Sequence, residues 1–161
     1  MLKKQLTNYN LYLKIILIFF LLIKTTLADI IKPRPDIKPN KVVKIQLSAL
    51  MKNDFPNKDS GIVQTWEFAH PNNQKVTGPL ERFKNMIKTD SYSMLINHAG
   101  HEIKEIYRSN ELATFEVIVL DNEKKYYKFK WQVEKYKLEG PLKNCWLTTA
   151  VSQPIPMGSS V

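Results

Sequence analysis

Between residues 43 and 88, apolar residues recur every three to four positions, which is the spacing of amphipathic helices. Stripes of this kind run through 43–51, 59–69 and 80–88, and each predicts one helix. The segments 53–57 and 70–73 contain proline and asparagine, so they are expected to end the first two helices. The expected starts are Asn40 as the first cap, Asp59 or Ser60 as the second, and Pro79 at the first position of the third helix.

From about residue 102 the period of the pattern falls from 3.6 to two, which is typical of strands with one buried face. The clearest strand is 125–135, where large apolar residues alternate with polar ones. We therefore expect Trp131 to be buried and its neighbour Lys130 to be exposed. Further strands are expected at 102–108, 112–120 and 144–151, with a polar turn joining the middle pair into a hairpin.

Helices followed by consecutive antiparallel strands predict an α+β fold, in which N-terminal helices pack on a curved antiparallel sheet of about four strands. The expected domain is a single unit over 41–151. Before it, 29–40 contains three prolines and reads as an extended leader. After it, 152–161 contains two prolines and a Gly-Ser-Ser run, and we expect a loose tail there.

The first 28 residues have the pattern of a secretory signal peptide. A basic start without acids precedes the nine-residue apolar run 15–23, and small residues lead to Ala28. Such a run is shorter than the roughly 20 residues of a spanning helix. We expect export to the periplasm, the outside or a lumen, with cleavage after Ala28 and no stable membrane span afterwards. The alternative is an uncleaved N-terminal membrane anchor.

Charge and cysteine content narrow the classes of function. Four of the 24 basic residues and none of the 15 acidic residues lie in 1–28, so cleavage lowers the net charge from +9 to +5. Only three of the basic residues are arginines, whereas nucleic-acid readers favour arginine. We therefore expect no nucleic acid as partner. A single cysteine, Cys145, excludes an intrachain disulfide, and its position in an apolar strand favours a buried thiol.

One short segment has the composition of a metal site. His98 and His101 are followed by Glu102 and Glu105, and two imidazoles with two carboxylates could hold a divalent ion. However, Gly100 suggests a turn, and a strand after it would point the two glutamates to opposite faces. The favoured interpretation is a polar connection, with His98 and His101 as a weak metal candidate. No cofactor is expected.

A second candidate is an acid–base pair. Asp54 and Asp59 flank the connection between the first two helices, and Asp54 could act as a general base with His98 as its partner. The competing interpretation is local turn and capping chemistry, which aspartate commonly performs. We favour the turn, because no sequence feature indicates the burial that would tune a carboxylate.

The aromatic residues are the largest binding resource of the chain. Most should belong to the core, but in a bent sheet covered by helices the same side chains can line a concavity. The residues expected to form such a ligand site are Trp66, Tyr92, Tyr127, Phe129 and Trp131.

Several short motifs together resemble an uncharacterised family, domain of unknown function 4864. They are Gln46-Leu47 with Ala49-Leu50, Asn53-Asp54, Asp59-x-Gly61-Ile62, Phe68-Ala69, Gly78, Glu81-Arg82-Phe83, Tyr92 with Leu95, His98, and Cys145-Trp146-Leu147-Thr148. The order of elements also resembles the cone of the nuclear-transport-factor-two-like, or cystatin-like, proteins. The resemblance implies a fold and an exported context but no reaction.

The function that these observations favour is non-enzymatic binding of a small apolar ligand or a protein partner by an exported domain. The alternative is an isomerase-like or hydratase-like enzyme that uses Asp54 and His98 in a cone pocket. The two differ in a testable way, because an enzyme needs these side chains close together at a pocket.

Overall fold

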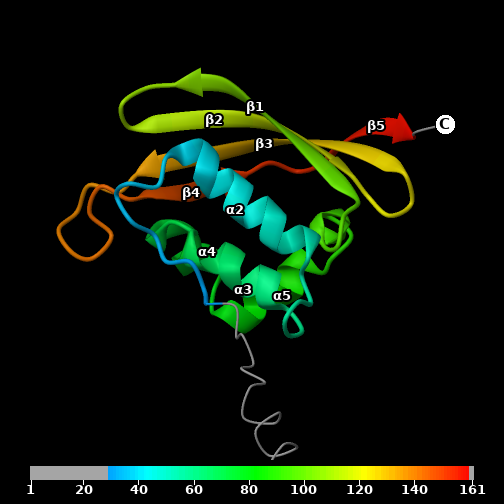
Figure 1. Ribbon diagram of the computed structural model, residues 1–161, viewed down its shortest axis with the longest axis horizontal. Coiled ribbons are helices and arrows are strands. Elements are labelled where there is room, and N and C mark those ends of the chain that lie inside the picture. Colours follow the sequence, from blue (N-terminus) through cyan, green and yellow to red (C-terminus); the bar gives the residue numbers. More distant parts are fainter. Residues whose placement is uncertain (1–28, 160–161) are drawn as a thin grey trace, which may run out of the picture.

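A curved antiparallel sheet forms one side of the molecule, and the helices cover its inner face (Figure 1). The computed structural model describes residues 29–159. The signal peptide expected at 1–28 lies outside these residues. No helix within 29–159 is long and apolar enough to span a membrane.

The helical half contains α2 (Pro39–Met51), α3 (Ser60–Glu67), α4 (Pro71–Thr77), α5 (Leu80–Ile87) and the short 3₁₀ helix η1 (Ser93–Leu95). Helix α2 lies directly under the sheet, α3 and α5 lie beyond it, and α4 reaches the sheet beside β4 (Figure 1). This central position explains why α2 buries residues on more than one side, among them Val42, Val43, Leu47 and Leu50.

The strands are β1 (Gly100–Arg108), β2 (Leu112–Leu120), β3 (Lys125–Lys135), β4 (Trp146–Val151) and β5 (Ile155–Ser159). Their order is β1-β2-β3-β4, and β5 pairs with β3 beside the start of that strand. The predicted α+β fold is therefore confirmed, with one additional strand. On the inner face Phe115 lies opposite Trp131 and Val117 opposite Phe129. Trp131 is 1% exposed whereas Lys130 is exposed, as the alternation predicts.

Two of the three expected helix starts differ by one or two residues, and the third has the expected cap residue. Helix α2 begins at Pro39, one residue before Asn40, and Lys38 takes the cap position without a side-chain hydrogen bond. Asp59 occupies the cap position of α3, but its side chain makes no capping hydrogen bond there. Pro79 takes the cap position of α5 instead of its first helical position. Backbone geometry and packing set these starts, because tertiary contacts override single-residue capping preferences.

Two elements were not expected. The segment after His70 forms α4, because Pro71 suits the first helical position and the His70 ring accepts a hydrogen bond from Asn72 N. The segment expected to be a loose tail contains β5, which adds backbone hydrogen bonds beside the first half of β3. All five β5 residues are exposed, so the order of this strand comes from strand pairing and not from core packing.

Candidate functional site

A small pocket lies between the helical layer and the inner face of the sheet. Its volume is about 120 Å³, which is smaller than the roughly 300–1,000 Å³ of most ligand pockets but near the roughly 150 Å³ of a cavity known to hold benzene. We call it the interlayer pocket. Its apolar walls come from Leu50, Phe83, Met86, Leu95, Trp131 and Val151.

The inner end of the interlayer pocket is closed by a buried polar network around Gln46. Gln46 is 1% exposed and donates from Nε2 to the backbone oxygen of Thr65 at 3.0 Å. Its Oε1 accepts hydrogen bonds from Thr148 Oγ1 at 2.6 Å and from Trp131 Nε1 at 3.1 Å. The network ties α2 and α3 to the sheet and fixes the indole of Trp131 in the pocket wall.

The outer end of the pocket is half-exposed and consists of Asn73, Met86, Tyr92 and Val151. Tyr92 donates from its hydroxyl to the backbone oxygen of Val151 at 3.4 Å. Burial raises the pKa of Tyr92, so the ring presents a neutral phenol at the mouth. The entrance of the pocket therefore lies where Tyr92 contacts Val151 of β4.

The pocket offers a ligand few protein groups that still lack a hydrogen-bond partner. Throughout residues 29–159, no buried side-chain nitrogen or oxygen is without a hydrogen-bond partner. A bound molecule would therefore gain mainly apolar contact, with polar contacts limited to lining side chains such as Thr148, Asn73 and Tyr92.

Two of the five expected ligand-binding residues line this pocket, namely Trp131 and Tyr92. Trp66 instead packs on the ring of Phe83, with centroids 4.9 Å apart, and Phe83 faces the pocket. Phe129 is 1% exposed within the core, and Tyr127 lies opposite Val119 near the β5 pairing. The alternation of β3 indicates which side chains face inward but not where along the strand the layers separate.

The structure assigns Asp54 a role in the turn before α3. Its carboxylate accepts hydrogen bonds from Asp59 N at 2.9 Å, from Asn53 Nδ2 at 2.9 Å and from Asn97 Nδ2 at 3.1 Å. The hydrogen bond from the Asp59 backbone is the main cause that lowers the pKa of Asp54. Asp54 is thus an exposed, ionised acceptor that organises the connection, and neither Asp54 nor His98 lines the interlayer pocket.

His98 is buried and pairs with His101 instead of Asp54. Its Nδ1 lies 2.8 Å from the backbone oxygen of Leu95, and its Nε2 lies 2.7 Å from His101 Nδ1. A carbonyl can only accept, so the proton of neutral His98 is on Nδ1, and its Nε2 accepts from His101 Nδ1–H. Burial is the main cause that lowers the pKa of both rings.

The His98–His101 contact uses ring nitrogens that a metal would need. Glu105 pairs with Arg108 at 2.6 Å, and no group of three or more His, Cys, Asp or Glu side chains in the described part of the chain is arranged to hold a metal ion. Cys145 is 0% exposed, and burial raises the pKa of its thiol.

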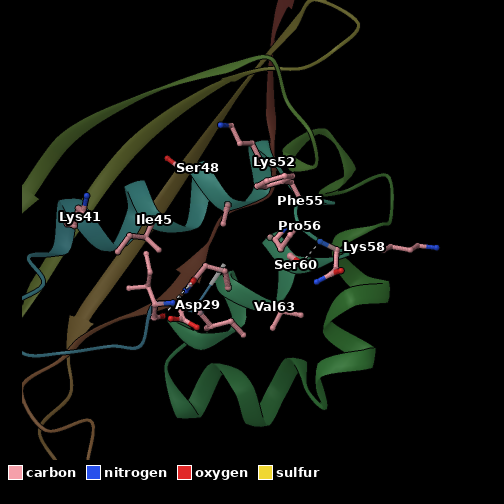
Figure 2. Close-up of a pocket in the computed structure, with 16 residues that line it drawn as sticks. Asp29, Lys41, Ile45, Ser48, Lys52, Phe55, Pro56, Lys58, Ser60 and Val63 are labelled. Atoms are coloured by element: carbon pink, nitrogen blue, oxygen red, sulfur yellow. Dashed lines mark hydrogen bonds between the residues drawn. The ribbon is translucent and has the colours of Figure 1, made fainter. Parts of the chain in front are cut away.

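A second hollow, which no sequence pattern indicates, is an open groove between α2 and α3. It has a volume of about 560 Å³ and is lined by residues of both helices, the connection between them and the first described residues, 29–31. Figure 2 shows Lys41, Ile45, Ser48 and Lys52 along the α2 side and Phe55 at one end. We call it the α2–α3 groove.

Residues 29–159 thus form an α+β fold with helices on one face of an open antiparallel sheet. The chain belongs to the family described as Domain of unknown function (DUF4864), whose pattern matches residues 34–152. No curated protein and no solved structure matches the chain. The family assignment covers all elements from α2 to β4 and carries no reaction with it.

Proposed function

We propose that this chain is an exported, non-enzymatic binding domain that holds a small apolar molecule in the interlayer pocket. The observation that carries the proposal is the pocket itself, which lies between the helices and the sheet with Trp131 and Tyr92 in its walls. Apolar walls with a few polar groups at the ends are typical of small-molecule sites.

The size of the pocket limits the ligand. A volume of about 120 Å³ suits a molecule of roughly six to eight heavy atoms, such as a single aromatic ring. The half-exposed Tyr92 and Asn73 offer one end of such a molecule a polar contact. A longer molecule would have to extend out through this mouth.

The test uses benzene and phenol as probes on the protein lacking residues 1–28. We expect the methyl signal of Met86, which lines the pocket, to shift in a ¹H–¹³C spectrum, and that of Met51, which does not line it, to stay unchanged. A probe at a hundred times its dissociation constant should also raise the free energy of unfolding by about 2.7 kcal/mol.

A matched pair of variants localises the binding. Ala69 is 4% exposed and lines the pocket, so Ala69→Ile should fill it and abolish the Met86 shift. Ala150 is exposed on β4, and Ala150→Ile should leave binding unchanged. Absence of any Met86 shift in the unmodified protein would refute the proposal, as would equal binding to both variants.

A further inference from the structure

The α2–α3 groove has an exposed apolar surface that no described segment covers. Phe55 is 73% exposed, and Ile30 and Ile31 are 41% and 46% exposed. These three side chains lie along a groove of about 560 Å³, which is more than four times the volume of the interlayer pocket. An apolar hollow of this size on a small domain marks a site of interaction.

One wall of the groove is formed by the first described residues, which hydrogen bonds and an ion pair hold against α3. The groove is therefore formed before any partner binds. Gln64 pairs with the backbone of Ile31 in both directions, accepting from its N–H at 2.7 Å and donating to its carbonyl at 2.8 Å. Lys32 adds an ion pair with Glu67 at 2.8 Å. Ile30 and Ile31 are thereby held as one wall.

Positive charge is spread along the length of the groove. Lys41 lies in the first turn of α2, and Lys52 is the residue that caps its C-terminus eleven positions later, about 16 Å along the helix axis, with Ile45 and Ser48 between them (Figure 2). Lys58 adds a third positive charge from the connection. None of these three lysines has an ion-pair partner within residues 29–159, and Asp29 is the one acidic lining residue.

We propose that the α2–α3 groove binds an acidic amphipathic segment of a partner protein. The apolar floor accepts side chains at helical spacing, and glutamates or aspartates beside them reach the lysines. About 16 Å between Lys41 and Lys52 corresponds to roughly eleven residues of a bound helix. This site is separate from the interlayer pocket, and the proposal does not depend on ligand binding there.

Charge and spacing favour an acidic partner segment over three other occupants: the apolar segment 15–23 of this chain, a second copy of the chain and a lipid head group. The apolar segment 15–23 of this chain is flanked by Lys14 and Lys24, so its flanks would repel the groove lysines. A second copy would bring together two chains of net positive charge. A lipid head group is a single compact anion, which Lys41 and Lys52 are too far apart to bind jointly.

The experiment uses two fluorescein-labelled twelve-residue peptides and the protein lacking residues 1–28. Both peptides carry leucines at helical spacing, with glutamates elsewhere in one and lysines elsewhere in the other. Fluorescence anisotropy should show binding of the glutamate peptide only. Raising the salt concentration should weaken that binding, because exposed charges are screened.

Two double variants of equal charge separate the groove from general charge attraction. Lys41→Gln with Lys52→Gln should weaken binding of the glutamate peptide about tenfold. Lys75→Gln with Lys104→Gln removes two exposed lysines outside the groove. This double variant should change the affinity for the glutamate peptide by no more than about twofold. Phe55→Ser tests the apolar contact and should also weaken binding.

Three results would overturn the proposal. The first is no binding of the glutamate peptide, and the second is equal weakening by the two double variants. The third is that the groove binds another occupant and not the peptide. A second copy of the chain would be seen as self-association in sedimentation, and a lipid surface as binding to anionic phospholipid vesicles that depends on Lys41 and Lys52.

Discussion

Gly61 allows α2 and α3 to approach closely. A Cβ atom at this position would lie 2.2 Å from the backbone oxygen of Ala49 and 2.8 Å from the Cα of Asn53. Asn53 completes the contact, because its backbone oxygen accepts from Gly61 N and its Oδ1 accepts from Ile62 N. The junction between the two helices thus depends on one residue without a side chain and one buried amide.

Replacing Gly61 with alanine should therefore destabilise the fold. We expect Gly61→Ala to lower the free energy of unfolding by about 1–3 kcal/mol, because backbone atoms must move apart to accept the methyl group. Gly100→Ala is the matched control, since nothing lies within 4 Å of its added Cβ. Urea unfolding measures both, and equal stability of the two variants would show that the helices can separate without cost.

At the residue scale, the sequence predicts exposure better than it predicts partners. The alternation along β3 correctly places Trp131 inside and Lys130 outside. It cannot predict the hydrogen bond between Gln46 and Thr148, because these residues are 102 positions apart. The same limit applies to the hydrogen bond that Asp54 accepts from Asn97, 43 positions away. The partners of His98 are local, Leu95 and His101, but burial periodicity does not show such hydrogen bonds either.

At the scale of elements, β5 is ordered mainly by one neighbouring strand. It pairs with β3 from Lys125 to Lys128, whereas β4 pairs with the remainder from Trp131 onward. Every β5 residue is exposed. A strand of this kind contributes backbone hydrogen bonds and covers an edge, but adds little buried apolar area.

Ending the chain after Pro154 should consequently have a local effect. We expect amide hydrogen exchange to become faster across Tyr126–Lys128, because hydrogen bonds to β5 are lost. Protection of the amides opposite β4, in Trp131–Lys135, should remain. Loss of protection in both halves of β3 would instead mean that β5 stabilises the whole sheet.

The elements that sequence reasoning predicts well are those with a regular burial pattern. Strands Leu112–Leu120 and Lys125–Lys135 have the predicted bounds. Helix α4 buries no residue, and β5 is exposed throughout, so neither has an apolar period for a pattern to show. From sequence alone, Pro71 predicts the end of the preceding helix, although proline equally suits the first turn of a new helix.

At the scale of the whole molecule, the two hollows have different origins. The interlayer pocket lies where α3–α5 meet the sheet beside α2, and its general position follows from the α+β order. The α2–α3 groove depends on residues 29–31 and on the connection through Phe55. Neither segment has a periodic pattern, which is why the sequence did not indicate the groove.

Histidine burial makes the stability of the whole domain depend on pH. Burial lowers the pKa of His98, His101 and His70, and Lys44 further lowers that of His101. In the unfolded chain these rings take up protons as the pH falls through about 6.5. The folded state binds fewer protons in this range, so the free energy of unfolding must decrease as the pH falls below that value.

We expect urea unfolding to show a stable plateau near pH 7.5 and a clear loss of stability by pH 5, at up to about 1.4 kcal/mol per pH unit for each proton of difference. Asp54 and Asp59 do not contribute in this window, because both titrate below the ordinary aspartate range in the folded state and near it in the unfolded chain. Their stabilising effect is lost only as the pH falls below about 4.

Variants assign this slope to the histidine pair. His98→Gln with His101→Gln should flatten the dependence between pH 7.5 and 5, whatever its effect on stability at pH 7.5. His70→Gln should flatten it less, because His70 is half-buried whereas His98 is 2% exposed. If a steep loss of stability persists in the double variant, the histidine pair is not its source. The pair in the unmodified protein would then accept a proton in the folded state, for instance by sharing it between His98 Nε2 and His101 Nδ1.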